Sequence, residues 1–145
     1  MSDRISKDQY GMQLAHTVKK RSSCIRRQVG CVLVDAQGII LATGYNGPAK
    51  GLPECEYNKR CTTPVEHTVG EDLHKCQAIH AEQNALMFCS DIRKIRICYT
   101  TTSPCLHCIK MLLNTGCESI IYEDLYDEEA MSMWDERRLS YVIDS

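Results

Sequence analysis

In the N-terminal part of the chain, the spacing of hydrophobic positions changes once, from that of a helix to that of strands. After Asp8, a candidate N-cap, small and apolar residues recur at helical spacing, which predicts a helix that ends near Arg21. Two short runs rich in β-branched residues follow at 29–34 and 39–43 and are typical of strands. The segment 35–38 between them has the composition of a turn, so we expect the two runs to form a β-hairpin.

The C-terminal half alternates between helical and strand patterns. It predicts helices at 80–88, 104–115 and 128–138, strands at 95–100 and 119–122, and an edge strand in the tail. In the first of these helices, Ala81, Ala85 and Phe88 share one face. Gly116 is expected to end the second helix as its C′ residue.

Residues 45–77 show no clear periodicity. A structureless connection of that length is uncommon inside a compact domain unless something holds it in place. Because cysteine and histidine residues lie in and beside this segment, a bound metal is the simplest candidate for such a constraint.

A hairpin followed by alternating helices and strands predicts one α/β domain over residues 1–145. At 145 residues the chain is long enough to bury a single core. We expect a three-layer α/β/α sandwich with a mixed five-stranded sheet. Right-handed crossovers between parallel strands place equivalent helix starts at the same sheet edge. The starts of the helices at 80 and 104 should therefore meet.

The composition is that of an ordinary globular protein, with 43% hydrophobic and 25% charged residues. A formal charge of -2 favours a small-molecule substrate, because proteins that bind nucleic acid are usually basic. The polar N-terminal segment lacks the apolar core of a secretion signal, so we expect the ten cysteines to be reduced thiols. No apolar run approaches the length of a membrane span. These features predict a cytoplasmic protein that interacts with neither nucleic acid nor membrane.

The strongest chemical signal comes from His80, Glu82, Cys105 and Cys108. They form the pattern H-x-E followed by P-C-x-x-C, which is the known signature of zinc-dependent nucleobase deaminases. Cysteines three apart lie on one helix face, and the positive end of a helix favours their thiolates. Pro104 just before them suits the first helical turn. Three ligands, His80, Cys105 and Cys108, leave one zinc position open for catalysis.

The charge of such a site indicates the task of Glu82. Two thiolates and a neutral imidazole cancel the charge of zinc, so the metal acidifies its water less than a site with three histidines does. Glu82 is then needed as a general base and afterwards as a general acid. The alternatives for the same residues are a structural zinc site and a redox C-x-x-C pair.

Three further segments strengthen this interpretation: 24–30, 44–48 and 51–55. With the metal motif they resemble the cytidine and deoxycytidylate deaminase superfamily, and most closely its deoxycytidylate branch, over about residues 8–126. The resemblance implies a cytidine deaminase-like fold and hydrolysis of dCMP to dUMP and ammonia, which supplies thymidylate synthesis. It also implies that water activated at zinc attacks C4 of cytosine, and that Glu82 protonates N3 and then the leaving amine. Asn46 would bind the sugar, and Ala81 would also contact the substrate.

Other activities remain open at this point. They are deamination of other cytosine nucleotides or nucleosides such as dCTP and cytidine, deamination of a polynucleotide, and zinc binding without catalysis. A phosphate site would favour a nucleotide, and five of the 17 cations lie within nine positions: Lys19, Lys20, Arg21, Arg26 and Arg27. The lysines suit the negative end of a helix, whereas Arg26 and Arg27, in a loop, suit phosphate.

The remaining cysteines predict a second, structural zinc. Cys31, Cys89, Cys98 and Cys117 fall within or beside predicted helices and strands, which indicates core positions. The resemblance places two ligands at Cys24 and Cys55 and the others just before the catalytic helix. We therefore expect the set Cys24, Cys55, His74 and Cys76, with Cys61 as the main substitute. The alternative is that these residues are free thiols.

The segment Gly44-Tyr45-Asn46-Gly47 predicts regulation. Without the resemblance it is simply a turn, since Asn-Gly pairs are usually turns. It matches the family element associated with activation by dCTP and inhibition by dTTP, with Mg²⁺ accompanying the triphosphate. Because the resembling enzymes are homohexamers, we expect a homohexamer here with effector sites near its interfaces.

Overall fold

The computed structural model describes residues 3–24, 26–52 and 78–144. Its centre is a five-stranded sheet in the order β2-β1-β5-β6-β7. The strands are β1 (Gly30–Val34), β2 (Ile40–Tyr45), β5 (Ile97–Thr102), β6 (Ser119–Asp124) and β7 (Leu139–Val142). β1 is antiparallel to β2 and to β5, whereas β5, β6 and β7 run parallel. The mixed five-stranded sheet and the edge strand in the tail are thus confirmed.

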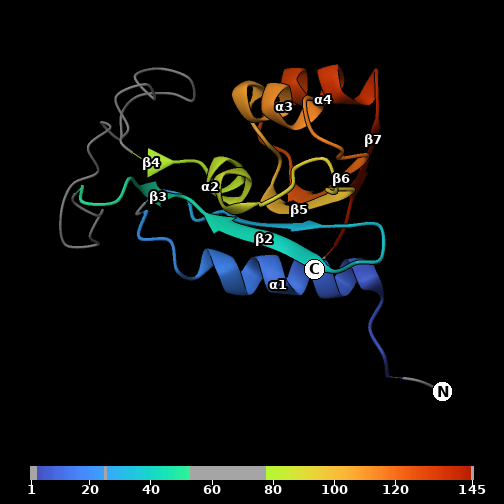
Figure 1. Cartoon of the computed structure of the whole chain (residues 1–145), viewed down its shortest axis with the longest axis horizontal. Helices are drawn as coiled ribbons and strands as arrows, with labels where there is room; N and C mark the ends of the chain where they lie inside the picture. Colours follow the sequence, from blue (N-terminus) through green and yellow to red (C-terminus); the bar gives the residue numbers. More distant parts are fainter. Residues whose placement is uncertain (1–2, 25, 53–77, 145) are drawn as a thin grey trace.

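Helices cover both faces of this sheet, which confirms the three layers (Figure 1). One face carries α1 (Lys7–Lys19), and the other carries α2 (Ala81–Phe88), α3 (Leu106–Leu113) and α4 (Glu128–Asp135). The chain connects β5 to β6 through α3 and β6 to β7 through α4, and the usual right-handed crossover places both helices on one face. None of the helices in these described residues is long and apolar enough to cross a membrane.

The N-cap of the first helix lies two residues before the predicted one. Ser6 is the N-cap, and its hydroxyl accepts a hydrogen bond from Gln9 N–H while the Gln9 side chain accepts from Ser6 N–H. This reciprocal pair satisfies two backbone donors at the helix start, so Asp8 is not needed there. Asp8 instead accepts a 2.8 Å hydrogen bond from the Tyr99 hydroxyl, which ties α1 to β5.

The β-hairpin is confirmed, and its second strand is longer than predicted. Asp35 Oδ1 accepts hydrogen bonds from the N–H groups of Gln37 and Ile39, and Gly38 has a φ of 84°. β2 extends to Tyr45, so Gly44 and Tyr45 end this strand and Asn46 links it to the next one. A small sheet follows it, in which β3 (Gly47–Pro48) pairs with β4 (Ala78–Ile79).

The predicted face of α2 is only partly correct. Ala81 and Ala85 are buried, but Phe88 is 75% exposed at the helix end. A Cβ atom at Gly44 would lie 2.3 Å from Ala81 O and 2.4 Å from Ala85 N. Glycine at 44 therefore lets the backbone of α2 lie directly on β2, which fixes the height of this helix above the sheet.

The end of α3 also differs from the prediction. The helix ends at Leu113, and Gly116 does not have the positive φ of a C′ glycine. A Cβ at Gly116 would lie 2.1 Å from Arg93 O, so its lack of a side chain serves packing. The helix carbonyls are satisfied instead by the guanidinium of Arg138, which donates to four carbonyl groups, those of Leu112, Leu113, Thr115 and Cys117.

Candidate metal centre and active site

Two of the predicted metal ligands are the N-cap residues of their helices. His80 caps α2 with φ -69° and ψ 154°, and Cys105 caps α3 with φ -76° and ψ 173°. Gln83 Oε1 accepts a 2.9 Å hydrogen bond from His80 N–H, which holds the backbone of that ligand. The predicted start of α2 is confirmed. Pro104 precedes the cap of α3 and does not belong to its first turn.

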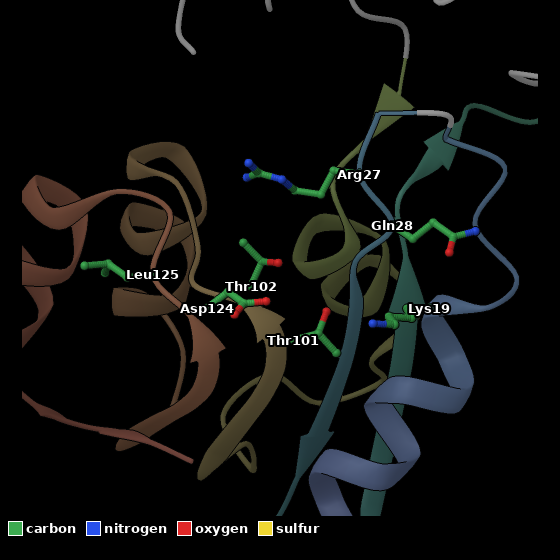
Figure 2. Close-up of a pocket in the computed structure, with 7 residues that line it drawn as sticks. All are labelled: Lys19, Arg27, Gln28, Thr101, Thr102, Asp124 and Leu125. Atoms are coloured by element: carbon green, nitrogen blue, oxygen red, sulfur yellow. The ribbon is translucent and has the colours of Figure 1, made fainter. Parts of the chain in front are cut away.

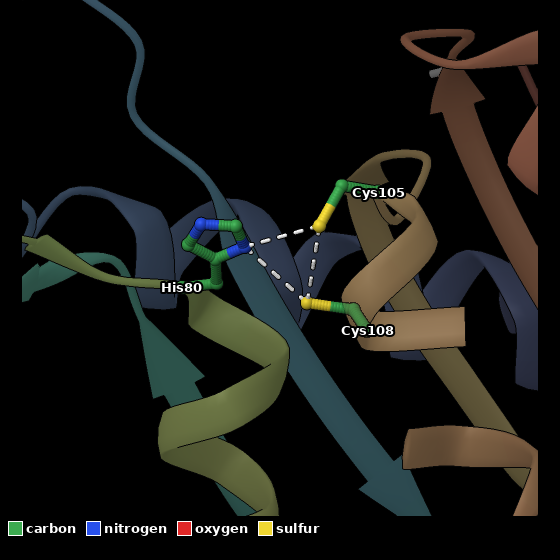
Figure 3. A group of neighbouring side chains, drawn as sticks. All are labelled: His80, Cys105 and Cys108. Atoms are coloured by element: carbon green, nitrogen blue, oxygen red, sulfur yellow. Dashed lines mark hydrogen bonds between the residues drawn. The ribbon is translucent and has the colours of Figure 1, made fainter. Parts of the chain in front are cut away.

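The side chains of His80, Cys105 and Cys108 form a small triangle (Figure 3). His80 Nδ1 lies 3.3 Å from Cys108 Sγ and 3.4 Å from Cys105 Sγ, and the two sulfurs are 3.7 Å apart. A tetrahedral zinc with bond lengths of about 2.3 Å to sulfur and 2.0 Å to nitrogen requires ligand separations of roughly 3.5–3.8 Å. The triangle therefore fits zinc with little adjustment, and it points Nδ1 of the imidazole at the metal position.

The sulfur atoms of this triangle are strongly coupled to each other. The hydrogen bond with Cys108 and the contact with His80 together lower the pKa of Cys105 to about 3. The same bond with Cys105 raises the pKa of Cys108 far above its usual value. A bound divalent ion favours the thiolate at both positions, so the pair would share its negative charge with the metal.

Glu82 lies in the first turn of α2, beside the metal ligands. It is only 4% exposed, and burial raises the pKa of its carboxyl group to about 7. The charge of a bound metal opposes this effect and favours the carboxylate. A buried carboxyl group that titrates near neutral pH is suited to accept a proton and to return it.

Ser103 connects the metal helix to the end of β6. Its N–H donates to Asp124 O at 2.8 Å, and its hydroxyl oxygen accepts from Tyr126 N–H at 2.8 Å. Tyr126 is therefore fixed next to the segment that leads into Cys105. Neither Ser103 nor Tyr126 is predicted by the sequence, because neither belongs to a periodic pattern.

Asn46 organises the segment that carries the two arginines. Its Oδ1 accepts from Val29 N–H at 2.9 Å, and its Nδ2 donates to Arg27 O at 2.7 Å. Its carbonyl oxygen accepts from the Ser22 hydroxyl at 2.8 Å. Both ends of the amide keep one further bonding position, so a contact with a sugar stays compatible with this structural role.

Arg26 and Arg27 are both exposed, and Arg27 points toward the end of β6. The guanidinium of Arg27 lies 4.5 Å from the centroid of the Tyr126 ring, a cation–π contact. Arg27 also lines a cavity of about 300 Å³ at the carboxyl ends of β5 and β6 (Figure 2). The Arg27 side chain is thus held between the Tyr126 ring and this cavity.

The residues predicted for regulation lie under and beside α2. Gly44 and Gly47 are buried, and Tyr45 is half-buried. Asn84 in α2 donates from Nδ2 to Tyr45 O at 2.8 Å. The segment 44–47 therefore contacts both the catalytic helix and, through Asn46, the backbone of Arg27.

Of the ligands predicted for the second metal site, the described residues include only Cys24. Cys24 is half-buried, and its sulfur accepts from Arg27 N–H at 3.4 Å. Cys55, Cys61, His74 and Cys76 lie outside the described residues. Of the predicted core cysteines, Cys31, Cys98 and Cys117 are buried, whereas Cys89 is half-buried at the end of α2.

Comparisons with known proteins agree with this geometry. The model of the cytidine and deoxycytidylate deaminase zinc-binding region matches residues 5–124. The chain is 37% identical to the deoxycytidylate deaminases of Schizosaccharomyces pombe over 131 residues and of Saccharomyces cerevisiae over 134 residues. These matches cover 88% and 90% of this chain but only 40% and 42% of the two yeast proteins.

A solved structure of similar length shows the same fold. The dCMP deaminase of the cyanophage S-TIM5, crystallised in complex with dCMP and dUMP, superposes with a TM-score of 0.75 at 28% identity. The match covers 97% of each chain. The arrangement of helices around the sheet is therefore shared over nearly the whole length.

Proposed function

Because the chain belongs to the cytidine and deoxycytidylate deaminase family, we propose that it is a zinc-dependent enzyme that hydrolyses dCMP to dUMP and ammonia. One observation carries the proposal: three ligand atoms within 4.8 Å of one another lie beside the buried carboxyl group of Glu82. Relatives that the chain matches over most of its own length are named deoxycytidylate deaminases. This activity supplies dUMP for thymidylate synthesis and suits the cytoplasm, where free nucleotides are found.

Glu82 moves the protons in this reaction. Its carboxylate takes one proton from the attacking water and delivers it to N3 of the cytosine ring. It then takes the second proton of that water, now on the oxygen at C4, and gives it to the amine, which leaves C4 as ammonia. Zinc held by His80, Cys105 and Cys108 supplies the Lewis acid that lowers the pKa of that water. Because two thiolates weaken this effect, the water also needs a base beside it. Ala81 and Asn46 would hold the substrate against the ligand triangle.

A substrate panel tests the proposal. Ammonia release is measured with dCMP, deoxycytidine, cytidine, dCTP and a cytosine-containing oligonucleotide, using zinc-loaded protein. We expect dCMP to react with the highest kcat/KM. Preference for cytidine or dCTP would assign the chain to another cytosine deaminase, and preference for the oligonucleotide would contradict the argument from its charge. No release from any substrate would favour a zinc module without catalysis.

Recognition of the 5′-phosphate is assigned to Arg27, with Arg26 beside it. Replacing Arg27 by Ala should lower kcat/KM for dCMP by about tenfold more than for deoxycytidine, because a guanidinium contact with phosphate is lost. Arg26→Ala is measured in parallel to decide which arginine contributes more. Kinetics with both substrates check this, and an equal loss with each would indicate a structural role.

We also propose regulation by dCTP and dTTP through the segment 44–47 of a homohexamer, with Mg²⁺ bound to the triphosphate. Support comes from the contacts of this segment, since Tyr45 O bonds to α2 and Asn46 bonds to the backbone of Arg27. A ligand that moves Tyr45 and Asn46 would shift the catalytic helix and the phosphate-binding arginine together. By linkage, substrate would change effector affinity equally.

Initial rates against dCMP concentration are expected to rise with dCTP and to fall with dTTP, and both effects should need Mg²⁺. Sedimentation measures the assembly in the same buffers. Rate curves that change only as simple competition at the active site would leave the regulatory proposal without support.

The second zinc is proposed at Cys24, Cys55, His74 and Cys76, with Cys61 as the substitute. Cysteine and histidine ligands of this kind typically hold structural zinc in tetrahedral sites. Elemental analysis of folded protein should then give two zinc ions per chain. A single zinc per chain would contradict the second site and leave the catalytic one unaffected.

A further inference from the structure

Lys19 takes a position that the sequence did not predict. It lies in the last turn of α1 and complements the negative end of the helix, as expected. Unlike its neighbour Lys20, however, it is half-buried and lines the cavity that Arg27 also lines. Two cations from different elements therefore face one cavity (Figure 2).

Packing at β1 holds Lys19 in this place. A Cβ atom at Gly30 would lie 2.0 Å from Ala15 O and 2.7 Å from Lys19 N. The last turns of α1 therefore rest directly on the β1 backbone, and the amine of Lys19 points toward Thr101 on the neighbouring strand β5 (Figure 2). Lys19 forms no ion pair within the part of the chain that the structure describes.

The charged residues that line the cavity give it a small net positive charge. Among the residues that the structure describes, Asp124 is the one carboxylate that lines the cavity, against Lys19 and Arg27. The neighbouring Glu123 is paired with His16, whose Nε2 lies 2.6 Å from its Oε1. The Gln28 amide is committed elsewhere, because its Nε2 donates to Ser22 O at 2.7 Å.

The cavity adjoins the metal centre. Thr101 and Thr102, which line it, end the strand that continues through Ser103 and Pro104 to the ligand Cys105. On the opposite side, β6 continues from the cavity to Tyr126, which is bonded to Ser103 and covered by Arg27. Tyr126 contacts Arg27, which lines the cavity, and it lies near enough to Cys105 to feel the charge of that thiol.

We infer that Lys19 is a second phosphate-binding residue, which acts with Arg27 to select substrates that carry a 5′-phosphate, while the Asp124 carboxylate weakens phosphate binding. This inference rests on the proposed deamination of dCMP. A phosphate in the cavity would lie between the ammonium and the guanidinium, and threonine hydroxyls are able to donate to its oxygens. The Asp124 carboxylate would weaken the binding of any phosphate there, because like charges repel.

The test compares two lysines that are adjacent in sequence. Lys19→Ala and Lys20→Ala remove the same charge from the same helix end, but only Lys19 lines the cavity. For Lys19→Ala, the ratio of kcat/KM for dCMP to that for deoxycytidine should fall about three- to tenfold, mainly through KM. For Lys20→Ala the ratio should stay within about twofold of wild type. The Lys19 effect should shrink as salt is raised, because the cavity is open to solvent.

Asp124→Asn provides a result of opposite sign. Removing the carboxylate should raise the same ratio by about two- to fivefold, which a merely folding-related change would not do. The inference is overturned if Lys19→Ala and Lys20→Ala give the same ratio, or if Lys19→Ala reduces turnover of both substrates equally. These outcomes leave the proposed function intact when wild type releases ammonia from dCMP. If wild type releases none from any substrate, the proposed function fails and the inference is overturned with it.

Discussion

Replacing Glu82 by Gln is expected to abolish deamination while the protein keeps its catalytic zinc. The amide keeps the shape of the side chain in its buried position but cannot take a proton from water or deliver one to N3. The zinc ligands are other residues, so metal binding should survive. We expect kcat to fall by about a thousandfold or more. Ammonia release and zinc content of the same preparation check both parts.

The control for this change is Glu118→Gln, which removes a carboxylate whose side chain is 73% exposed. It should keep wild-type turnover. Near wild-type activity of Glu82→Gln would rule out the carboxylate as the proton carrier. Loss of zinc from Glu82→Gln would instead show that this residue supports the metal site.

Replacing Cys105 by Ala is expected to remove both the catalytic zinc and the activity. A site left with His80 and Cys108 provides two ligand atoms, and zinc in proteins normally requires at least three. Turnover should fall by more than about a thousandfold, and the zinc content should fall by one ion per chain. A chelator should have the same effect on wild type, and added zinc should restore that activity but not the activity of the variant.

Cys89→Ala is the matched control. Cys89 is half-buried like Cys105 and caps a helix on the same face of the sheet, but it is the C-cap of α2, whereas Cys105 is the N-cap of α3. It should retain zinc and activity. Thermal unfolding of the two variants separates loss of metal from loss of fold. If Cys105→Ala kept full zinc content and turnover, the ligand triangle would not be the catalytic metal site.

The sequence by itself selected the residues of the candidate site and determined most of the elements. His80, Glu82, Cys105 and Cys108 could be selected because metal coordination and proton transfer require particular side chains at particular spacings. The alternation of strand and helix patterns also predicted the mixed sheet with helices on both faces, since periodicity reflects which side of each element is buried. These features are local, and so a single chain reveals them.

Boundaries and caps were less predictable, because competing residues lie within one turn of each other. Ser6 and Asp8 are both good N-cap residues, and the bond between Asp8 and Tyr99 shows that a distant strand occupies one of them. Gly116 has the composition of a helix stop, but its small size serves the approach of Arg93 O. Phe88 continues the apolar face of α2 in sequence and yet is exposed, at the last position of the helix.

Only the tertiary structure decided which polar residues surround the metal centre. Ser103 and Tyr126 are joined by one hydrogen bond across 23 positions, and Arg27 contacts Tyr126 from another part of the chain. Lys19 and Lys20 are the same residue type at adjacent positions, so the sequence does not separate their roles. The packing of α1 on Gly30 is what turns Lys19 toward the cavity. The sequence encodes which side chains can bind phosphate or metal, whereas the strand order and the packing of helices decide which of them meet.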